Sequence, residues 1–561
     1  MGRLLTLLSP REAAAYYAAG TWAGDTLYSL LTQWADERPD RPALRDSARV
    51  LSWKALRAAV DGMAASLREA GIAPGDRVSV WTSNRAEAVI TFLACSREGF
   101  VYNTSLHQSY TVEETVRALQ QVGARALVAE VGHGADASQV SVFEASGAVP
   151  SLRARYGLPS RRLPELAVPA QALPFPSAAS LAQTPTADDP DQICYLAFTS
   201  GTTGAPKGVM HSDNSLLANA RAMVRDWALD ADTVLLSLSQ MSHHIGTVAL
   251  TQTLVGGFEL VLFDPGAGID PLDAILQTGA TYVMGVPTHA IDVVAKARSR
   301  GLERLGRVTT FYMAGALIPG ETARALTALG ALPQNVYGMT ECGSHNYPLP
   351  SDDAETIERT CGRSCDAYEI RLFDQNDRDR EVGTGEIGEI GGRGAARMLG
   401  YFANQAATEG SFNASGWFLS GDLGRFDDKG NLHIVGRSKD IIIRGGHNIH
   451  PAKIEDLAMR HPAIGKVAAI PVPDERLGEK VCLVAMRAER DEPATAQAIL
   501  AHLADAGLAK FDMPEYFAWV DELPLGPTGK ILKHELIAWL KAGRLAPEPV
   551  RWQPLAQDAR A

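Results

Sequence analysis

The chain has 561 residues, of which 46% are hydrophobic and 21% are charged, and its formal net charge at pH 7 is −12. Single hydrophobic cores rarely grow past a few hundred residues, so this length predicts more than one domain. The composition is typical of a soluble globular protein, and the acidic balance argues against nucleic acid as a partner.

The six cysteines are too sparse for the dense disulfide framework of small secreted proteins. Cys361 and Cys365 have the spacing of half a metal site, but no second pair at zinc spacing accompanies them. The sequence therefore favours a structural role for both. It contains no apolar run of about 18 residues or more, which predicts no membrane span. The apolar patch Leu4–Leu8 is too short for the core of a signal peptide, so a cytoplasmic location is expected.

Alternating helices and strands are predicted over residues 51–124. The periodicity predicts a helix over Ser52–Ala70, a buried strand over Val78–Trp81 and a helix over Ala86–Glu98. Such alternation favours parallel sheets covered by helices. Residues 131–192 are rich in Pro, Ser, Ala and Gly and lose this periodicity, which predicts an extended surface segment.

The alternation resumes at Ser215. Buried strands are predicted over Tyr282–Val286 and Thr309–Met313, and a helix over Gly320–Leu329. Glycine-rich and turn-rich sequence from Glu381 to Gly436 then indicates a smaller β-rich section.

The pattern changes again after Lys439, to a small α+β unit. Strands are predicted over Val467–Pro471 and Val481–Met486, and helices over Ala494–Ala506 and near Ile531–Lys541.

The predicted fold class is α/β. We expect a large N-terminal domain, residues 1–438, of helix-covered β-sheets plus the β-rich section. A small, mobile α+β C-terminal domain is expected over residues 439–561.

The most informative segment is Thr199–Gly208, which reads T-S-G-T-T-G-A-P-K-G after the apolar run Ile193–Phe198. Glycines let backbone N–H groups approach a ligand, hydroxyls add donors, and Lys207 adds a positive charge. This composition suits a triphosphate, although the Walker A spacing is absent. The alternative is a flexible surface turn. The candidate phosphate-binding residues are Thr199, Ser200, Gly201, Thr202, Thr203, Gly204 and Lys207.

This loop resembles the phosphate-binding loop of the adenylate-forming superfamily, which comprises acyl-CoA synthetases, firefly luciferase and the adenylation domains of peptide synthetases. Four further segments resemble the superfamily in the expected order, so the resemblance covers nearly the whole chain. They are Val336–Glu341 (V-Y-G-M-T-E), Ser420–Gly424 (S-G-D-L-G), Gly436–Glu455 and Pro524–Ile531 (P-L-G-P-T-G-K-I).

In Val336–Glu341 the resemblance implies that Tyr337 stacks on adenine, that Thr340 contacts the α-phosphate and that Glu341 holds Mg²⁺. An aromatic face suits a purine, and a carboxylate suits Mg²⁺ beside phosphate oxygens. The same resemblance assigns nearby positions to the nucleotide and the border of the acyl pocket, namely Gly315, Ala316, Asn335, Gly338 and Met339.

The next two segments are expected to complete the nucleotide site and to carry a hinge. The resemblance implies that Asp422 binds both ribose hydroxyls, as a carboxylate can, and that Arg437 reaches the ribose or a phosphate. Lys439 occupies the hinge position. Gly445 and Gly446 would let the pantetheine thiol of coenzyme A pass close to the backbone. The same residues also describe a plain hairpin with a Gly-Gly turn.

Lys530 matches the catalytic lysine of the superfamily, which bridges the substrate carboxylate and the α-phosphate. The resemblance implies that a carboxylate attacks the α-phosphorus of Mg·ATP and releases pyrophosphate. After a rotation about Lys439, a thiol, with coenzyme A as the leading expectation, expels AMP. The predicted cofactors are ATP, Mg²⁺ and coenzyme A. The predicted partner is a small-molecule carboxylic acid, and a homodimer is left open.

The acyl pocket is expected to include His244, which would face the carboxylate or act as a lid. The role of the neighbouring His243 stays open, because packed structural histidines are the alternative for this pair. No acid lies nearby to pair with an α-amine, so alicyclic, aromatic or medium-chain acids are favoured, and Asn103–Gln108 resembles cyclohexanecarboxylate-type ligases. The expected pocket segments are Met241–Val248, Met284–Pro287, Ala314–Ala316 and Gly338–His345.

Three other functions stay open from the sequence. The enzyme could pass the acyl group to an amine or a carrier-protein thiol instead of coenzyme A. A luciferase-like oxygenase is a further alternative. A nucleotide-binding regulator that has lost its chemistry is disfavoured, because both Lys530 and Glu341 are present.

Overall fold

The computed structural model describes residues 4–179, 186–199, 206–315, 320–445, 447–488, 494–526 and 530–552. The chain divides into two compact units. The first unit comprises residues 1–315, 322–369 and 393–412, and the second comprises residues 316–321, 370–392 and 413–561. None of the described helices is long and apolar enough to cross a membrane.

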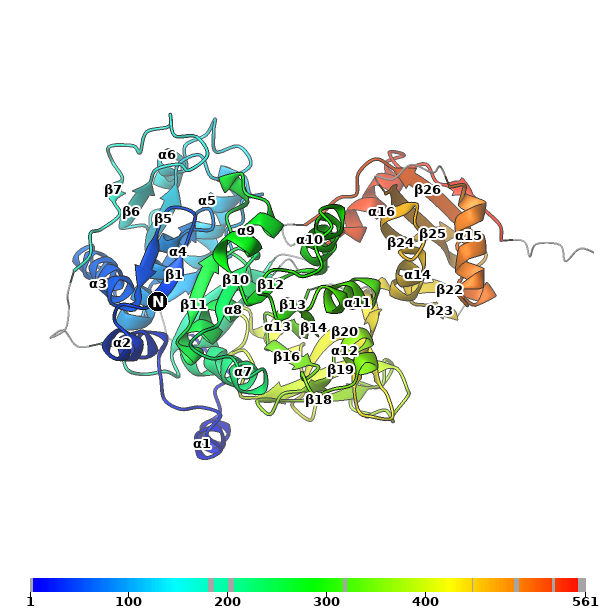
Figure 1. Ribbon diagram of the computed structural model, residues 1–561, viewed down its shortest axis with the longest axis horizontal. Coiled ribbons are helices and arrows are strands. Elements are labelled where there is room, and N and C mark those ends of the chain that lie inside the picture. Colours follow the sequence, from blue (N-terminus) through cyan, green and yellow to red (C-terminus); the bar gives the residue numbers. More distant parts are fainter. Residues whose placement is uncertain are drawn as a thin grey trace, which may run out of the picture. The chain divides into compact units, whose positions relative to one another are not determined.

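The first unit contains two seven-stranded sheets (Figure 1). One has the order β7-β6-β5-β3-β4-β8-β9, in which β8 and β9 pair antiparallel and the other neighbours pair parallel. Its strands are β3 (Arg77–Trp81), β4 (Val101–Asn103), β5 (Ala126–Glu130), β6 (Ala154–Leu158), β7 (Leu173–Pro174), β8 (Ile193–Thr199) and β9 (Lys207–Ser212).

The other large sheet has the order β14-β13-β12-β10-β11-β1-β2, and only its edge pair β1–β2 is antiparallel among the strands that the structure describes. The strands are β1 (Pro42–Arg45), β2 (Val50–Ser52), β10 (Val234–Ser237), β11 (Glu259–Leu262), β12 (Tyr282–Gly285), β13 (Thr310–Met313) and β14 (Leu332–Asn335). A small antiparallel sheet of β15 (Tyr337–Met339), β16 (Gly343–Tyr347) and β17 (Arg363–Ser364) follows β14 in the chain.

Helices connect these strands, as parallel pairing requires. Their bounds are α1 (Pro10–Ala18), α2 (Leu27–Glu37), α3 (Trp53–Glu69), α4 (Ala86–Glu98), α5 (Val112–Val122), α6 (Val142–Ala145), α7 (Asp213–Asp226), α8 (His244–Gly256), α9 (Pro271–Thr278), α10 (Pro287–Ser299), α11 (Gly320–Ala328), α12 (Ala354–Arg359) and α13 (Gln405–Glu409).

Local sequence sets where these helices begin and end. A capping box starts α5, since the Thr111 hydroxyl accepts the Glu114 N–H while the Glu114 carboxylate accepts the Thr111 N–H. Gly99 ends α4 with a φ of 71°, a left-handed conformation that glycine adopts without a steric penalty. These signals explain why the helix predicted over Ala86–Glu98 is confirmed at both ends.

The second unit contains a four-stranded sheet, β18-β19-β20-β21, most of which belongs to it, and a six-stranded sheet. The first has β18 (Tyr368–Phe373), β19 (Gly388–Gly394), β20 (Phe418–Phe426) and β21 (Leu432–Arg437). The second has β22 (Ile442–Arg444), β23 (His447–Ile449), β24 (Ile464–Asp474), β25 (Gly478–Arg487), β26 (Tyr516–Val520) and β27 (Glu548–Pro549), with helices α14 (Pro451–Ala458), α15 (Ala496–Asp505) and α16 (Lys533–Lys541).

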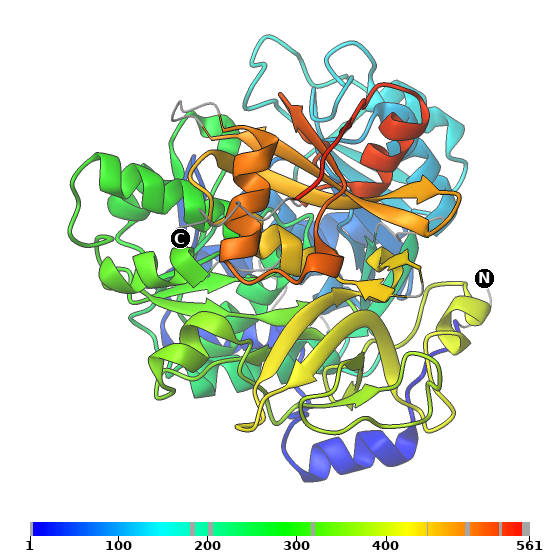
Figure 2. The same ribbon diagram turned by 90° about the vertical axis from the view of Figure 1, so that its right-hand side faces the viewer.

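Two cores lie on opposite faces of this six-stranded sheet, because successive strand residues point to opposite sides. On β24, Val467 and Ala469 pack in one core with residues of α14 and α15. Ala468 and Ile470 pack in the other core, to which α16 contributes Leu536. The strands of this sheet, in orange, and helix α16, in red, are seen in Figure 2. The predicted α+β organisation of this region is therefore observed.

The predicted α/β fold class is confirmed, but the extended segment predicted over residues 131–192 contains regular structure. Within it, β6 pairs with β5 and β7 inside a large sheet. The missing signal has a physical cause: Arg155 and Gly157 interrupt the apolar run of this strand. A Cβ atom at Gly157 would approach the side chain of Val168 to 2.4 Å, so the packing there requires glycine.

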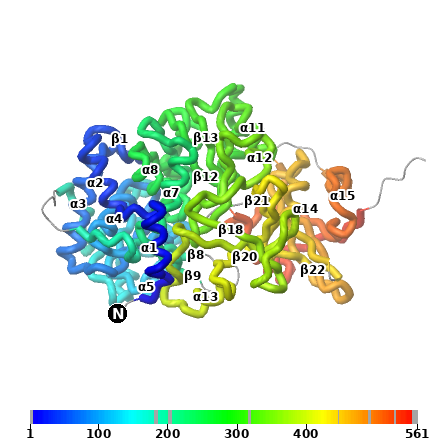
Figure 3. Tube along the Cα trace, turned by 90° about the horizontal axis from the view of Figure 1, so that it is seen from below, coloured from blue at the N-terminus to red at the C-terminus, as the bar shows by residue number. Residues whose placement is uncertain are grey.

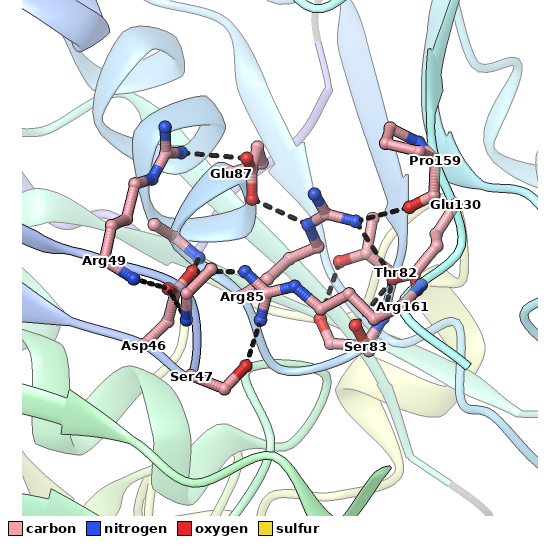
Figure 4. Close-up of polar contacts among 12 residues, drawn as sticks. Asp46, Ser47, Arg49, Thr82, Ser83, Arg85, Glu87, Glu130, Pro159 and Arg161 are labelled. Atoms are coloured by element: carbon pink, nitrogen blue, oxygen red, sulfur yellow. Dashed lines mark hydrogen bonds and ion pairs between the residues drawn. The ribbon is translucent and has the colours of Figure 1, made fainter. Parts of the chain in front are cut away.

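A buried ion-pair network joins the carboxyl ends of the two large sheets (Figure 4). Arg85 contacts Glu87 at 2.7 Å and Glu130, the last residue of β5, at 3.4 Å. Asp46, directly after β1, accepts the Arg161 guanidinium at 2.6 Å. Burial opposes ionisation of Glu130, but hydrogen bonds from Ser83 and Arg161 and the charge of Arg85 hold the pKa of this carboxyl below its ordinary value.

The network predicts a large stability loss on removal of its central cation. Arg85→Ala leaves Glu87 and Glu130 as buried carboxylates without that cation, and breaking such a pair typically costs about 3–5 kcal/mol. Chemical denaturation should show a loss of this size in the free energy of unfolding. Arg117→Ala is the control, because its pair with Glu113 is 69% and 79% exposed and should contribute about 0.5 kcal/mol or less. Equal losses in the two variants would contradict a structural role for the network.

Candidate active site

The predicted phosphate loop connects two antiparallel strands. Thr199 ends β8, Lys207 begins β9, and these two residues are register partners. The turn between them, with Ser200, Gly201, Thr202, Thr203 and Gly204, lies outside the described residues. The structure therefore fixes the two ends of the loop.

Lys207 and Glu341 meet at one aromatic ring. The Nζ of Lys207 lies 4.7 Å from the centroid of the Tyr401 ring. The Tyr401 hydroxyl donates a hydrogen bond of 2.9 Å to Oε1 of Glu341. Burial and the charge of Glu341 raise the pKa of Tyr401, so its hydroxyl stays protonated and donates. A cation and a carboxylate far apart in the sequence thus share one neighbour.

The segment Met398–Phe402, which contains Tyr401, runs along β9 (Figure 3). Backbone hydrogen bonds from this segment hold Tyr401 beside Lys207 and Glu341. The N–H of Leu399 donates to the carbonyl of Met210, and the N–H of Phe402 donates to that of Gly208, both at 2.7 Å. The N–H of Met398 donates to the carbonyl of Glu341 itself, also at 2.7 Å. The segment therefore fixes Glu341 relative to the β8–β9 hairpin.

The Y-G-M-T-E motif begins with the short strand β15. Tyr337 packs edge-on against His345, with ring centroids 5.4 Å apart. A Cβ atom at Gly338 would lie 2.0 Å from the carbonyl oxygen of Gly343, so β15 and β16 approach too closely for any other residue. Met339 pairs with Gly343 and ends β15.

Asn335 ends β14 directly before this motif. Its Nδ2 donates to the carbonyl of Ile357 at 2.7 Å, while its buried Oδ1 has no hydrogen-bond partner within the described part of the chain. An unpaired buried acceptor is costly and suits a ligand that donates. Gly315 follows β13 with a φ of 92°, and the next predicted residue, Ala316, lies outside the described residues.

Two histidines, His211 and His244, lie next to each other, and His211 contacts Thr340. The Nε2 of His211 donates to the Thr340 carbonyl at 2.6 Å, which sets the tautomer, and its Nδ1 lies 2.9 Å from the Ser215 hydroxyl. The ring of His244 stacks at 5.7 Å on that of His211. Burial lowers the pKa of His244 to about 3 and that of His211 to about 4. Both rings therefore carry no charge near neutral pH.

A small pocket opens beside these rings. Its lining includes His244, Val248 and Gly343 from the expected pocket segments, but also helix α7 and Ala396, which the sequence did not indicate. Asn219 on α7 holds Ser344, accepting its N–H at 2.9 Å and donating to its carbonyl at 2.8 Å. The complete lining is His211, Ser215, Leu216, Asn219, His244, Val248, Thr251, Gly343 and Ala396.

The role of His243 was left open, and the structure shows its packing. Its ring stacks on His107 with centroids 4.4 Å apart and an interplanar angle of 18°. Nδ1 of His107 in turn lies 3.3 Å from the Ser242 hydroxyl. His243 is not among the residues that line the pocket.

In the second unit, Asp422 and Arg437 are register partners on β20 and β21. The guanidinium Nε of Arg437 donates to Oδ1 of Asp422 at 2.9 Å. Gly421, with a φ of 78°, turns the chain before Asp422, and its N–H donates to the Glu389 carboxylate at 3.0 Å. The carboxylate of Asp422 is therefore held in place beside the guanidinium of Arg437.

Of the remaining predicted residues of this unit, the structure describes Lys439, Gly445 and Lys530. Lys439 is in a short 3-10 helix, Ser438–Asp440. Gly445 has a φ of 59° in the turn from β22 to β23 and donates its N–H to Leu477. Gly446 lies outside the described residues. The carbonyl of Lys530 accepts the N–H of Gly526 at 2.7 Å, which closes the terminal loop.

Sequence reasoning missed three residues of the site: Tyr401, His211 and Asn219. Each has a weak sequence signal, because each contacts its partners across the fold and not along the chain. The Leu399-Gly400-Tyr401 segment is apolar and gives no chemical reason to expect it beside Glu341. His211 follows the phosphate loop closely, which was the one available clue.

Two family models match the chain. The description "AMP-binding enzyme" matches residues 31–402, and "AMP-binding enzyme C-terminal domain" matches residues 453–530. The chain belongs to the AMP-binding enzyme family. The predicted superfamily is therefore confirmed, and the relatives of this chain include both acyl-CoA ligases and aryl-adenylating enzymes.

Relatives match over nearly their full lengths. A salicylyl-CoA synthase / salicylate adenylyltransferase of Streptomyces sp is 32% identical over an alignment of 540 residues, which covers 94% of this chain and 96% of that protein. A medium-chain fatty-acid–CoA ligase of Escherichia coli (strain K12) is 28% identical, covering 93% of this chain and 92% of the relative. ATP-bound MatB from Rhodopseudomonas palustris superposes with a TM-score of 0.77 at 28% identity, covering 92% and 99% of the two chains.

Asp213, the buried first residue of α7, predicts that the stability of the protein depends on pH. Later residues of the same helix line the pocket. Asp213 accepts hydrogen bonds from the Leu27 N–H and the Ser96 hydroxyl, and burial raises its pKa to about 6. A pKa raised above that of the unfolded chain favours folding at low pH, and this contribution is lost as the pH rises through 6. Asp213→Asn keeps an acceptor for Leu27 and does not ionise.

Denaturation at pH 5.0 and 7.5 tests this expectation. The stability of the original protein relative to Asp213→Asn should fall by about 1–2 kcal/mol over that range. A difference that stays constant, or that changes in the opposite direction, would contradict a buried carboxyl with a raised pKa.

Proposed function

We propose that the protein is an ATP-dependent carboxylic acid–CoA ligase that forms an acyl-adenylate and then an acyl-CoA thioester, releasing pyrophosphate and AMP. The observation that carries this proposal is the meeting of Lys207 and Glu341 at Tyr401. In this proposal Lys207 is the cation that binds phosphate and Glu341 is the carboxylate that binds the metal ion, and the loop that follows β8 has a composition that suits a triphosphate.

ATP has groups that match the predicted binding residues, beginning with Asn335. The unpartnered acceptor Oδ1 of Asn335 suits the amino group of adenine, which donates. Tyr337 would stack on the ring, Gly315, Ala316, Gly338 and Met339 would border it, and Asp422 with Arg437 would bind the ribose. The hydroxyls and N–H groups of the loop would hold the phosphates, together with Lys207.

Mg²⁺ fits the oxygen donor that Glu341 provides, since carboxylates are the protein ligands this ion prefers. When bound, the ion would neutralise charge on the phosphate oxygens. The side chain of Thr340 would contact the α-phosphate, and the Thr340 carbonyl is held by His211 at 2.6 Å. The protein's part in this step is to orient Glu341 and Thr340 toward one phosphate group.

The bonding of the polar side chains around His244 favours an acid with an apolar body as the substrate. The polar side chains of the pocket already bond within the protein: Asn219 to Ser344, His211 to Thr340 and the Thr251 hydroxyl to Val248. Burying further polar groups there would gain few hydrogen bonds. We therefore favour an alicyclic, aromatic or medium-chain acid, with the neutral ring of His244 near its carboxylate.

The C-terminal residues would act in both halves of the reaction. We propose a domain boundary at Lys439 as the hinge, with residues 1–438 and 439–561 as the two domains. Lys530 would donate to the carboxylate and the α-phosphate during adenylation. A rotation would then replace it with the face of Gly445 and Gly446, along which the thiol of coenzyme A would enter.

One alternative keeps the adenylation but changes the acceptor. Among the relatives is a salicyl-AMP ligase / salicyl-S-ArCP synthetase of Mycobacterium tuberculosis, 32% identical over 549 residues. This favours a carrier-protein thiol as the second candidate acceptor, ahead of an amine. A cytoplasmic location stays a prediction, and whether the protein forms a homodimer stays open.

Measuring the two half-reactions separately tests the proposal. Lys530→Ala should reduce acid-dependent exchange of pyrophosphate into ATP by about 100- to 1,000-fold, because a preorganised charge donor is lost. Thioester formation from preformed acyl-adenylate should change little. Lys541→Ala, an exposed lysine of the same unit, is the control.

The same assay, run over a panel of acids and acceptors, tests the substrate assignment. Exchange with cyclohexanecarboxylate, benzoate or octanoate, and thioester formation with coenzyme A, are expected. Equal loss of both half-reactions in Lys530→Ala would contradict the two-conformation mechanism. Product formation with a carrier protein alone would favour the alternative acceptor.

A further inference from the structure

One tyrosine contacts two groups to which the proposed function gives different tasks. The hydroxyl of Tyr401 donates to Oε1 of Glu341 at 2.9 Å, and its ring lies 4.7 Å from Nζ of Lys207. Tyr401 is only 6% exposed and Glu341 is 5% exposed, so water does not compete strongly for this hydrogen bond.

The backbone fixes Tyr401 before any ligand binds. Its N–H donates to the Thr408 hydroxyl at 3.0 Å, and it forms a bridge with Val209 of β9. Its neighbour Phe402 donates its N–H to Gly208, at 2.7 Å. A phenol held at so many points moves little when the groups beside it bind ligands.

Each contact has a separate physical effect. A carboxylate that accepts a hydrogen bond on one oxygen has its plane fixed, which also sets the direction of its second oxygen. The negative face of an aromatic ring attracts an ammonium group and holds it in one place. Such partners behind a metal-binding side chain tune affinity for the ion.

We propose that Tyr401 is a positioning residue, whose hydroxyl orients the Glu341 carboxylate for the divalent cation and whose ring places the Lys207 ammonium for the β- and γ-phosphates. This inference rests on the proposed function. It adds a residue that touches neither the acid nor the reacting phosphorus.

Two variants separate the two contacts. Tyr401→Phe removes the hydroxyl and keeps the ring beside Lys207. Tyr401→Leu removes both. Metal binding is read by electron paramagnetic resonance of Mn²⁺ in the presence of ATP and without acid, and ATP binding without metal is read by calorimetry in EDTA.

The expected results differ between the variants. Tyr401→Phe should weaken Mn²⁺ binding in the ternary complex by about 10- to 100-fold, as loss of a residue behind a metal ligand does. Its affinity for ATP without metal should stay within about threefold of the original. Tyr401→Leu should in addition weaken metal-free ATP binding by about twofold to fivefold.

Tyr28→Phe is the matched control, because it removes another buried phenol-to-carboxylate hydrogen bond, to Asp61 at 2.7 Å. Its Mn²⁺ affinity should be unchanged, while its thermal stability falls as in Tyr401→Phe. Unchanged Mn²⁺ binding in Tyr401→Phe, or an equal loss in Tyr28→Phe, would overturn the inference. Failure of the original protein to bind Mn²⁺ and ATP together would overturn the proposed function itself, and this inference with it.

Discussion

The pairing of β9 on both of its edges is the constraint on which the candidate site depends. One edge pairs with β8 in a hairpin, and the other bonds to Met398–Phe402. An outer strand left open would present unpaired N–H and C=O groups. Covering that edge also places Tyr401 beside Lys207 and Glu341. The same hydrogen bonds therefore complete the sheet and position the polar side chains.

Much of the first unit's site is built to stay uncharged and internally satisfied. His211 and His244 are neutral because burial lowers the pKa of each, and Asn219 uses its amide on the backbone of Ser344. Charge is concentrated instead at Lys207 and Glu341. In the proposed mechanism the remaining catalytic charge comes from Lys530, which belongs to the second unit. In a ligase organised in this way, uncharged residues would bind the acid, and charged residues elsewhere would assist its attack on ATP.

The sequence predicted the parts of the protein that depend on local patterns. Helix α4 and the strands β24 and β25 of the C-terminal sheet follow from periodicity and capping, and the family motifs follow from resemblance. It did not predict β6, because Gly157 and Arg155 break the apolar run, nor the pocket wall on α7. Tyr401 escaped for a similar reason, since its contacts with Lys207 and Glu341 form only when distant segments meet. Those contacts are set by tertiary packing, which short-range patterns do not encode.

The central claim is that the acid attacks the α-phosphorus of ATP, and transfer of labelled oxygen tests it directly. The protein is incubated with ATP, Mg²⁺, coenzyme A and a carboxylic acid that carries ¹⁸O in its carboxylate, and the nucleotide and phosphate products are analysed by mass spectrometry. The account predicts that AMP acquires one ¹⁸O and that pyrophosphate acquires none. Label in inorganic phosphate with ADP as product, or unlabelled AMP formed alongside the thioester, would contradict it.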